Sequence, residues 1–176
     1  MLPKNPNLEI DYSQYALKEI YFAGGCFWGT DAYLARVKGV CSTEAGYANG
    51  NTENPSYEEV CKNNTGHAET VKVLFAPELI NLRELTRIYF GITDPTSLNK
   101  QAGDTGTQYR VGVYYTDKED EPVLRELFAE LQKNYDKPIV TELLPLENYY
   151  PAEEYHQDYL EKNPGGYCHV SFDGLE

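Results

Sequence analysis

The sequence contains little positive charge and no long hydrophobic segment. It has 15 Lys and Arg against 28 Asp and Glu, which gives a formal net charge of −13. A field of that sign repels phosphate backbones and anionic lipid surfaces, so we expect no nucleic-acid partner. No run approaches the roughly 18 apolar residues of a membrane span, and the first 19 residues lack the apolar centre of a signal peptide. We therefore expect no membrane association.

Cysteine is also scarce, and its spacing excludes several site types. The four cysteines include no Cys-x-x-Cys pair and are too few for a disulfide-stapled secreted scaffold; they are Cys26, Cys41, Cys61 and Cys168. Histidines that could ligate a metal stand without a second ligand nearby, and no Gly-x-Gly-x-x-Gly or phosphate-binding loop occurs. We expect no metal and no cofactor, and a reducing, cytoplasmic environment.

Hydrophobic periodicity predicts one mixed α/β domain in a chain of 176 residues. The predicted strands cover residues 19–23, 40–47, 69–75, 110–115 and 140–144. The predicted helices cover residues 26–37, 57–62, 80–90, 118–135 and 152–161, and residues 91–107 form a long polar connector.

The order of these elements favours a two-layer α+β fold. We interpret it as a ferredoxin-like (split βαβ) plait with an extra C-terminal strand, a short helix and an irregular tail. A catalytic domain over residues 19–162 is predicted to follow an irregular arm at residues 1–18 that drapes over it. A Gly-rich tail at residues 163–176 follows and carries Cys168.

Cys26 is the strongest candidate for a reactive side chain. It follows Gly24 and Gly25 and opens a predicted helix, where unpaired backbone N–H groups and the helix dipole favour a thiolate. Glycines on both sides keep the sulfur accessible. The alternative is a buried structural cysteine.

Two large aromatic residues, Phe27 and Trp28, follow the cysteine directly. Neighbouring residues at a helix start cannot both face the core, so one of them is expected to line a small apolar pocket. Periodicity supports ordinary core packing equally well.

These motifs resemble the peptide methionine sulfoxide reductase A family. The resemblance covers about residues 18 to 168, and its ordered blocks are Gly24–Gly29, Gly46–Ala48, Asn54–Tyr57, Gly66–Glu69, Gly103–Arg110, Tyr155–Gln157 and Asn163–Cys168. It implies reduction of the S epimer of methionine sulfoxide, free or in proteins, to methionine, as a repair of oxidative damage.

The resemblance also implies the roles of individual residues. Cys26 would be the nucleophile and Glu69 the acid that protonates the sulfoxide oxygen, which requires burial to raise the pKa of Glu69. Tyr57 and Tyr109 would hold that oxygen. Three further residues complete the implied site, with Asp104 ordering it and Phe27 and Trp28 enclosing the substrate methyl group.

The implied cycle leaves Cys26 as a sulfenic acid that condenses with Cys168, and thioredoxin then reopens the disulfide. The glycine-rich tail is expected to let Cys168 swing toward Cys26. Cys41 and Cys61 are expected in the core, yet Cys41 departs from the family pattern, so either remains open as another resolving thiol. Asn49 stands at a position where the family commonly has glycine, and we expect asparagine to accept the left-handed backbone conformation there.

Two other functions fit parts of the pattern. A Cys–His thiol hydrolase or acyl transferase would pair Cys26 with His67 or His156, although His156 is better explained as a supporting hydrogen-bonding residue. A non-enzymatic protein could bind oxidised peptides through the aromatic pocket. His169 is expected to lie exposed in the tail.

Overall fold

A computed structural model describes residues 2–62 and 64–175. Met1 and Glu176, the outer ends of the predicted arm and tail, lie outside the described residues. The strands are β1 (Lys18–Ala23), β2 (Val40–Ala48), β3 (Ala68–Phe75), β4 (Lys100–Gln101), β5 (Asp104–Thr105), β6 (Gly112–Tyr115), β7 (Glu142–Pro145) and β8 (Tyr149–Pro151). The α-helices are α1 (Phe27–Ala35), α2 (Tyr57–Lys62), α3 (Leu82–Gly91), α4 (Asp120–Gln132) and α5 (Tyr159–Lys162). Short 3-10 helices occupy η1 (Pro6–Glu9), η2 (Tyr12–Gln14), η3 (Thr107–Tyr109) and η4 (Glu154–His156).

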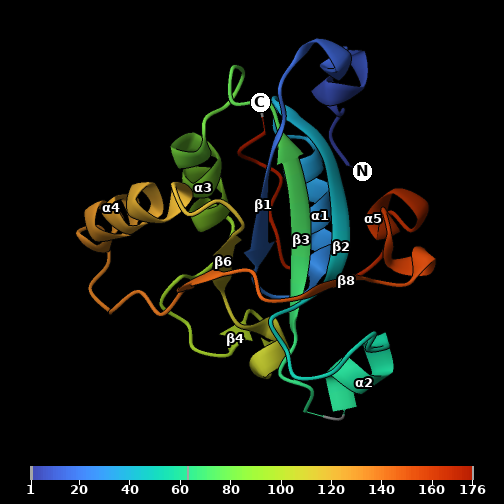
Figure 1. Ribbon diagram of the computed structural model, residues 1–176. Coiled ribbons are helices and arrows are strands. Elements are labelled where there is room, and N and C mark those ends of the chain that lie inside the picture. Colours follow the sequence, from blue (N-terminus) through green and yellow to red (C-terminus); the bar gives the residue numbers. More distant parts are fainter. Residues whose placement is uncertain (1, 63, 176) are drawn as a thin grey trace.

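A six-stranded sheet in the order β7-β6-β1-β3-β2-β8 forms the centre of the fold (Figure 1). Its neighbouring strands are antiparallel, except that β6 and β7 are parallel and joined through α4. Ile20 and Phe22 point to one face of β1, where they share a core with Leu34 of α1 and Leu85 of α3. Because side chains alternate along a β-strand, the residues on this face of β1 pack against α1 and α3. The predicted mixed α+β fold is confirmed.

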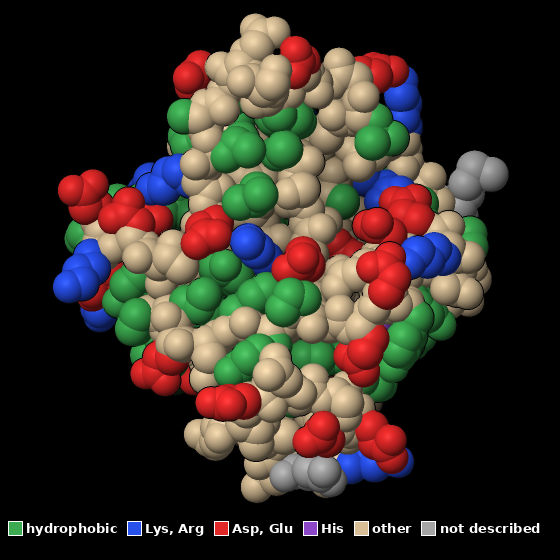
Figure 2. Space-filling model, turned by 45° about the vertical axis from the view of Figure 1, so that its right-hand side comes forward, with side chains coloured by type: hydrophobic (Ala, Val, Ile, Leu, Met, Phe, Trp, Pro, Cys, Tyr) green, Lys and Arg blue, Asp and Glu red, His purple; other side chains and the backbone are tan. Residues whose placement is uncertain are grey.

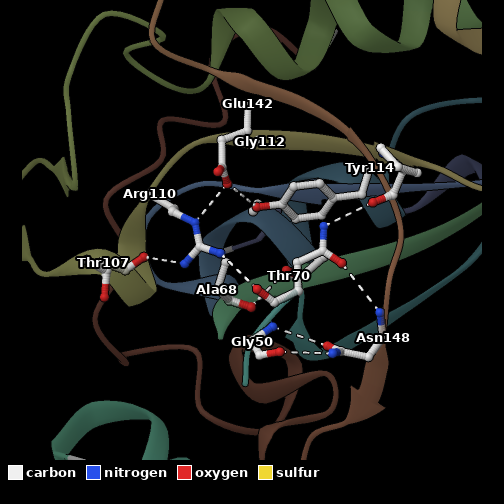
Figure 3. A network of polar contacts seen from close by, with 12 residues as sticks. Gly50, Ala68, Thr70, Thr107, Arg110, Gly112, Tyr114, Glu142 and Asn148 are labelled. Carbon is white, nitrogen blue, oxygen red and sulfur yellow. Dashed lines mark hydrogen bonds and ion pairs between the residues drawn. The ribbon is translucent and has the colours of Figure 1, made fainter. Parts of the chain in front are cut away.

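The opposite face carries a smaller cluster around Tyr21 and Tyr114, and the connector from β7 to β8 covers it. A polar network fastens this connector to the sheet (Figure 3). Arg110 donates to Glu142 at 2.7 Å, to the Thr107 carbonyl at 3.0 Å and to the Asn49 carbonyl at 3.3 Å. One side chain therefore joins η3, β7 and the end of β2.

Asn49 has the predicted left-handed backbone, with φ of 53°. Its side-chain oxygen accepts from the Glu147 N–H at 2.7 Å, and its side-chain nitrogen donates to the Pro145 carbonyl at 3.2 Å. A glycine would fit the same backbone but could not form these bonds.

The predicted helix over residues 152–161 is wrong, because two short helices replace it. Asp158 between them has φ of 52°, a left-handed conformation that an α-helix cannot contain. Gln157 is extended, and its side chain accepts from the Ala45 N–H and donates to the Ala45 carbonyl, both at 2.8 Å. These tertiary bonds compensate for the interrupted helix.

Hydrophobic periodicity did not predict the short strands and 3-10 helices in the connectors and in the arm. Strand β8 was not predicted, and the polar connector contains the β4–β5 hairpin. The arm forms η1 and η2 where no regular structure was expected. It lies against the domain through buried Asn7, which donates to the carbonyls of Ala35 and Val37 at 2.8 Å and accepts from the Gly39 N–H at 3.1 Å.

Candidate functional site

Cys26 lies in the turn between β1 and α1. Gly25 has φ of +70°, and its N–H donates to the Tyr109 carbonyl at 3.1 Å, which fixes the turn against η3. Cys26 is the N-cap residue of α1, so its thiol sits beside the first helical N–H groups. The side chain is only 5% exposed. The predicted strand, glycine turn and helix are therefore present, but the sulfur is buried and not open to solvent.

Burial raises the pKa of the Cys26 thiol, and the nearby Glu69 carboxyl raises it further. The Trp28 backbone N–H lowers this pKa but does not compensate. The expectation that the helix start favours a thiolate is thus wrong for the free protein, because desolvation of the charge outweighs the helix N-terminus. Cys26 rests as a thiol.

Glu69 belongs to the helix-facing side of β3, which it shares with Val71 and Val73. That alternation directs its carboxyl toward the first turn of α1, where Oε1 accepts from the Phe27 N–H at 3.2 Å. Its other oxygen, Oε2, is buried without a partner among the described residues. The side chain is 1% exposed, and burial raises the pKa of Glu69 to about 8. Glu69 is therefore protonated at neutral pH, as the proton-donor hypothesis requires.

Tyr57 and Tyr109 come from different elements to the same place. Burial raises the pKa of both phenols, and the Glu69 carboxyl raises both further. Both side chains therefore keep their hydroxyl protons. The Tyr57 ring lies 6.3 Å from the Phe27 ring in a stacked arrangement. The structure thus gathers these two donors and Glu69 around the start of α1.

The two aromatic residues after Cys26 take different positions. Phe27 is fully buried and joins the core, whereas Trp28 is half-buried. The Trp28 ring stacks on Tyr159 with centroids 3.8 Å apart, and its Nε1–H donates to His156 Nδ1 at 3.0 Å. Trp28 is thereby held rigidly at the edge of the site.

His67 and His156 form hydrogen bonds with groups other than Cys26. His156 accepts at Nδ1, and burial lowers its pKa, so its imidazole is neutral and supports Trp28. His67 contacts the Thr52 carbonyl through Nε2 at 2.7 Å. In the described part of the chain neither imidazole hydrogen-bonds Cys26.

The C-terminal tail is docked over the site. Tyr167 donates to the Asp104 carboxylate at 3.0 Å, and Val170 is buried in the core. Cys168 Sγ lies against Gly29, so near that an added Cβ there would approach it to 2.9 Å. The structure thus brings Asp104 and Cys168 to the start of α1. The expectation of an exposed His169 is wrong, because its Nε2 bonds the Cys26 carbonyl at 3.0 Å.

The other two cysteines differ in their distance from the site. Cys41 is the second residue of β2, and the strand register puts Val40 opposite Phe75 but Tyr47 opposite Glu69. Six residues at roughly 3.3 Å each put Cys41 about 20 Å from Glu69. Cys61 is half-buried beside the site; burial raises the pKa of its thiol, and the hydroxyls of Tyr57 and Tyr109 lower it. Neither cysteine is a fully buried core residue.

Glu153 supports the site and was missed by the sequence analysis. Its Oε1 accepts from the Tyr47 hydroxyl at 2.8 Å, and its Oε2 accepts from the Tyr57 N–H at 3.0 Å. One carboxylate thus fixes the start of α2 relative to β2. The only signal in the sequence is its place next to the block Tyr155–Gln157, which carries no spacing rule for such a role.

Acidic side chains are spread over the surface in Figure 2, with fewer basic ones between them. Within residues 2–62 and 64–175, no three His, Cys, Asp or Glu side chains gather as they would around a metal ion. None of the helices described is long and apolar enough to cross a membrane.

Similar proteins share both the sequence and the fold. The chain is 55% identical to peptide methionine sulfoxide reductase MsrA of Clostridium botulinum (strain Okra) over 157 residues, which are 89% of this chain and all of that protein. The crystal structure of reduced Mxr1 from Saccharomyces cerevisiae has a TM-score of 0.84 and 39% identity, covering 90% of this chain and 94% of Mxr1.

A second structure of Mxr1, in complex with Trx2, has a TM-score of 0.59 and 29% identity and covers 86% of this chain and 90% of that one. The family described as peptide methionine sulfoxide reductase matches residues 18–175, nearly the whole chain. With that match and the 55% identity, the chain belongs to the peptide methionine sulfoxide reductase family.

Proposed function

We propose that this enzyme reduces the S epimer of methionine sulfoxide, free or in proteins, with Cys26 as nucleophile and Glu69 as proton donor. The observation that carries the proposal is the buried Glu69 carboxyl, with a pKa raised to about 8, next to a helix-capping cysteine. A sulfoxide sulfur becomes electrophilic when its oxygen is protonated or hydrogen-bonded. Glu69, Tyr57 and Tyr109 supply three such donors around Cys26.

The first half-reaction transfers one oxygen atom. The Cys26 sulfur attacks the sulfoxide sulfur while Glu69 protonates the oxygen and the phenols of Tyr57 and Tyr109 hold it. The attack forms an S–S bond between Cys26 and the substrate, and the S–O bond breaks as the protonated oxygen leaves as water. A water molecule then attacks the Cys26 sulfur, the S–S bond breaks, and methionine leaves with the bonding electrons, so that the net transfer leaves an oxygen on Cys26 as a sulfenic acid. Because burial raises the pKa of the thiol, it needs a base at the moment of attack, and we assign that role to the Glu69 carboxylate left by the first transfer.

The aromatic residues support binding of the substrate methyl group. Trp28 is held by its stack on Tyr159 and its bond to His156, so its half-buried face is rigid. Phe27 is buried next to it in the sequence, and Asp104 orders the site through Tyr167. Apolar aromatic side chains favour contact with a methyl group over contact with water.

The second half-reaction forms a Cys26–Cys168 disulfide. Cys168 lies beside the first turn of α1, whereas Cys41 lies about 20 Å along the sheet. Thioredoxin then reduces the disulfide by thiol–disulfide exchange, a proposal supported by the structure of yeast Mxr1 with Trx2. We place this cycle in the cytoplasm, where free thiols persist.

The fold assignment is refined in the same proposal. The inner strand order β6-β1-β3-β2, in a β-α-β-β-α-β succession, supports a ferredoxin-like plait. The catalytic domain then covers residues 19–162, between an arm at 1–18 and a tail at 163–176.

Single-turnover mass spectrometry tests the proposal. One equivalent of methionine S-sulfoxide should give one equivalent of methionine and a protein lighter by two hydrogen atoms, with a Cys26–Cys168 disulfide in the peptide map. A hydrolase would show an acyl adduct with an ester substrate, and a peptide binder would show no change in mass. Either result, without methionine, would contradict the proposal.

The variant Cys168→Ser separates the two half-reactions. It should form one methionine per enzyme and then stop under thioredoxin, because the proposed resolving thiol is absent. Cys41→Ser is the matched control and should recycle normally. Normal recycling of Cys168→Ser would transfer the resolving role to Cys61 or to an external thiol.

A further inference from the structure

Two glycines of the block Gly24–Gly29, Gly25 and Gly29, form the surface against which the C-terminal tail packs. An added Cβ on Gly25 would approach the His169 ring to 2.6 Å at Nε2, and one on Gly29 would approach Cys168 Sγ to 2.9 Å. Both distances are too short for real Cβ atoms, so the tail occupies the space that the missing side chains leave. The glycines therefore make room for the tail, and the Cys26 sulfur is buried despite them.

The tail is attached on both sides of Cys168. Before it, Tyr167 donates to Asp104 at 3.0 Å, and after it, Val170 is buried at 8% exposure. The Val170 N–H also donates to Cys168 Sγ at 3.4 Å, while the thiol donates to the Val170 carbonyl at 3.3 Å. The sulfur is thus fixed by its own turn.

His169 is the link between this turn and the nucleophile. A carbonyl oxygen only accepts, so His169 Nε2 carries a proton and donates it to the Cys26 carbonyl at 3.0 Å. Among the described residues this hydrogen bond is the one that joins the tail directly to Cys26. This hydrogen bond holds the C-terminal tail, which carries Cys168, close to Cys26, with which Cys168 must react.

We infer that His169 is a positioning residue for the resolving step, holding Cys168 at the start of α1 through its bond to the Cys26 carbonyl. The inference rests on the proposed function and deepens it. In this step the Cys168 sulfur attacks the Cys26 sulfur of the sulfenic acid, and an S–S bond forms. The S–O bond breaks, and the hydroxyl leaves as water with the Cys168 thiol proton; Cys168 is oxidised and Cys26 is reduced.

The two half-reactions depend differently on this contact. Reduction of the sulfoxide requires the Cys26 thiol, the Glu69 carboxyl and the two phenols, and the His169 ring bonds the Cys26 backbone carbonyl but none of these groups. Disulfide formation requires the two sulfurs to meet in a narrow geometry, and a displacement of about 1 Å can cost a step about a hundredfold in rate. Loss of the imidazole should therefore slow only the second step.

The experiment compares wild type with His169→Ala, His169→Gln and the tail control Ser171→Ala in single turnover with methionine S-sulfoxide. Methionine is quantified against time, and the Cys26 sulfenic acid is trapped with dimedone and measured by intact-mass spectrometry. Urea unfolding of each variant checks that the fold is unchanged.

We expect His169→Ala to release methionine within about twofold of the wild-type rate but to form the disulfide about tenfold or more slowly, with dimedone adduct accumulating. His169→Gln, whose amide can still donate to the carbonyl, should recover most of the disulfide rate, and Ser171→Ala should match wild type.

Disulfide formation by His169→Ala at the wild-type rate would overturn the inference. So would an equal loss in His169→Ala and His169→Gln, because the donated hydrogen bond would then not be the cause. Failure of the wild-type protein to form methionine or a Cys26 adduct would overturn the proposed function as well, and is distinguished by the methionine measurement.

Discussion

Replacing Glu69 by Gln should change how the stability of the protein depends on pH. The folded pKa of Glu69 is about 8, above its ordinary value of 4.5. Below pH 4.5 the carboxyl is protonated in both states and has no effect. As pH rises above 4.5, the unfolded chain ionises first, so wild-type stability falls until pH reaches about 8. Glutamine does not ionise, and the variant lacks this decline.

The size of the effect follows from the linkage between protons and folding. At about 1.36 kcal/mol per pH unit, Glu69 lowers the free energy of unfolding by about 4 kcal/mol between pH 5 and pH 8. Asp31, whose pKa is raised to about 6 by burial, contributes to both proteins and cancels in the comparison. Glutamine keeps an oxygen for the Phe27 N–H, so this hydrogen bond is retained.

Urea unfolding followed by Trp28 fluorescence at pH 5, 6, 7 and 8 measures this difference. The wild type should lose stability relative to Glu69→Gln as pH rises, and single-turnover reduction by the variant should be about 10² to 10⁴ times slower. Parallel stability curves would refute the protonated buried carboxyl. An unchanged rate would remove Glu69 from the acid role.

Three further predictions concern Cys26, Arg110 and Asn7. Alkylation of Cys26 by iodoacetamide in the free enzyme should still accelerate above pH 9, because burial raises its pKa; a plateau by pH 7 in the peptide map would contradict this. Arg110→Lys cannot keep the three bonds of the guanidinium, so urea unfolding should show a loss of about 1–3 kcal/mol together with a lower kcat, whereas a change under about 0.5 kcal/mol would argue against the network. Asn7→Ala removes three hydrogen bonds to the backbone at the end of α1 and after it, and should cost about 2 kcal/mol without a change in kcat; a loss of activity at full stability would contradict a purely structural role.

Local patterns predicted the main elements because periodicity and burial agree there. Val71 and Val73 alternate with outward residues, and Leu82, Leu85 and Tyr89 follow a helical stripe, so β3 and α3 were placed within a few residues. The helix over 152–161 failed because its interruption depends on a bond between Gln157 and Ala45, which no local pattern contains.

The electrostatics of the candidate site could not be predicted from the sequence. Resemblance placed Cys26, Glu69, Tyr57 and Tyr109 in one site, and the structure gathers them around the start of α1. The direction of the Cys26 pKa could not be predicted, because the desolvation comes partly from a tail whose His169 stands 143 positions later in the chain. Burial by distant segments is a tertiary property.

The position of Cys168 in the C-terminal tail affects how the Cys26 sulfenic acid competes with further oxidation. A thiol in the same molecule reacts as if it were present at a high local concentration. Short flexible linkers already give effective concentrations in the millimolar range, and a fixed geometry raises this value further. Glutathione or peroxide from bulk solvent would have to outcompete Cys168 for the same sulfur. In the proposed cycle, closure of the Cys26–Cys168 disulfide would shield Cys26 from the irreversible sulfinic state under the conditions that create the substrate.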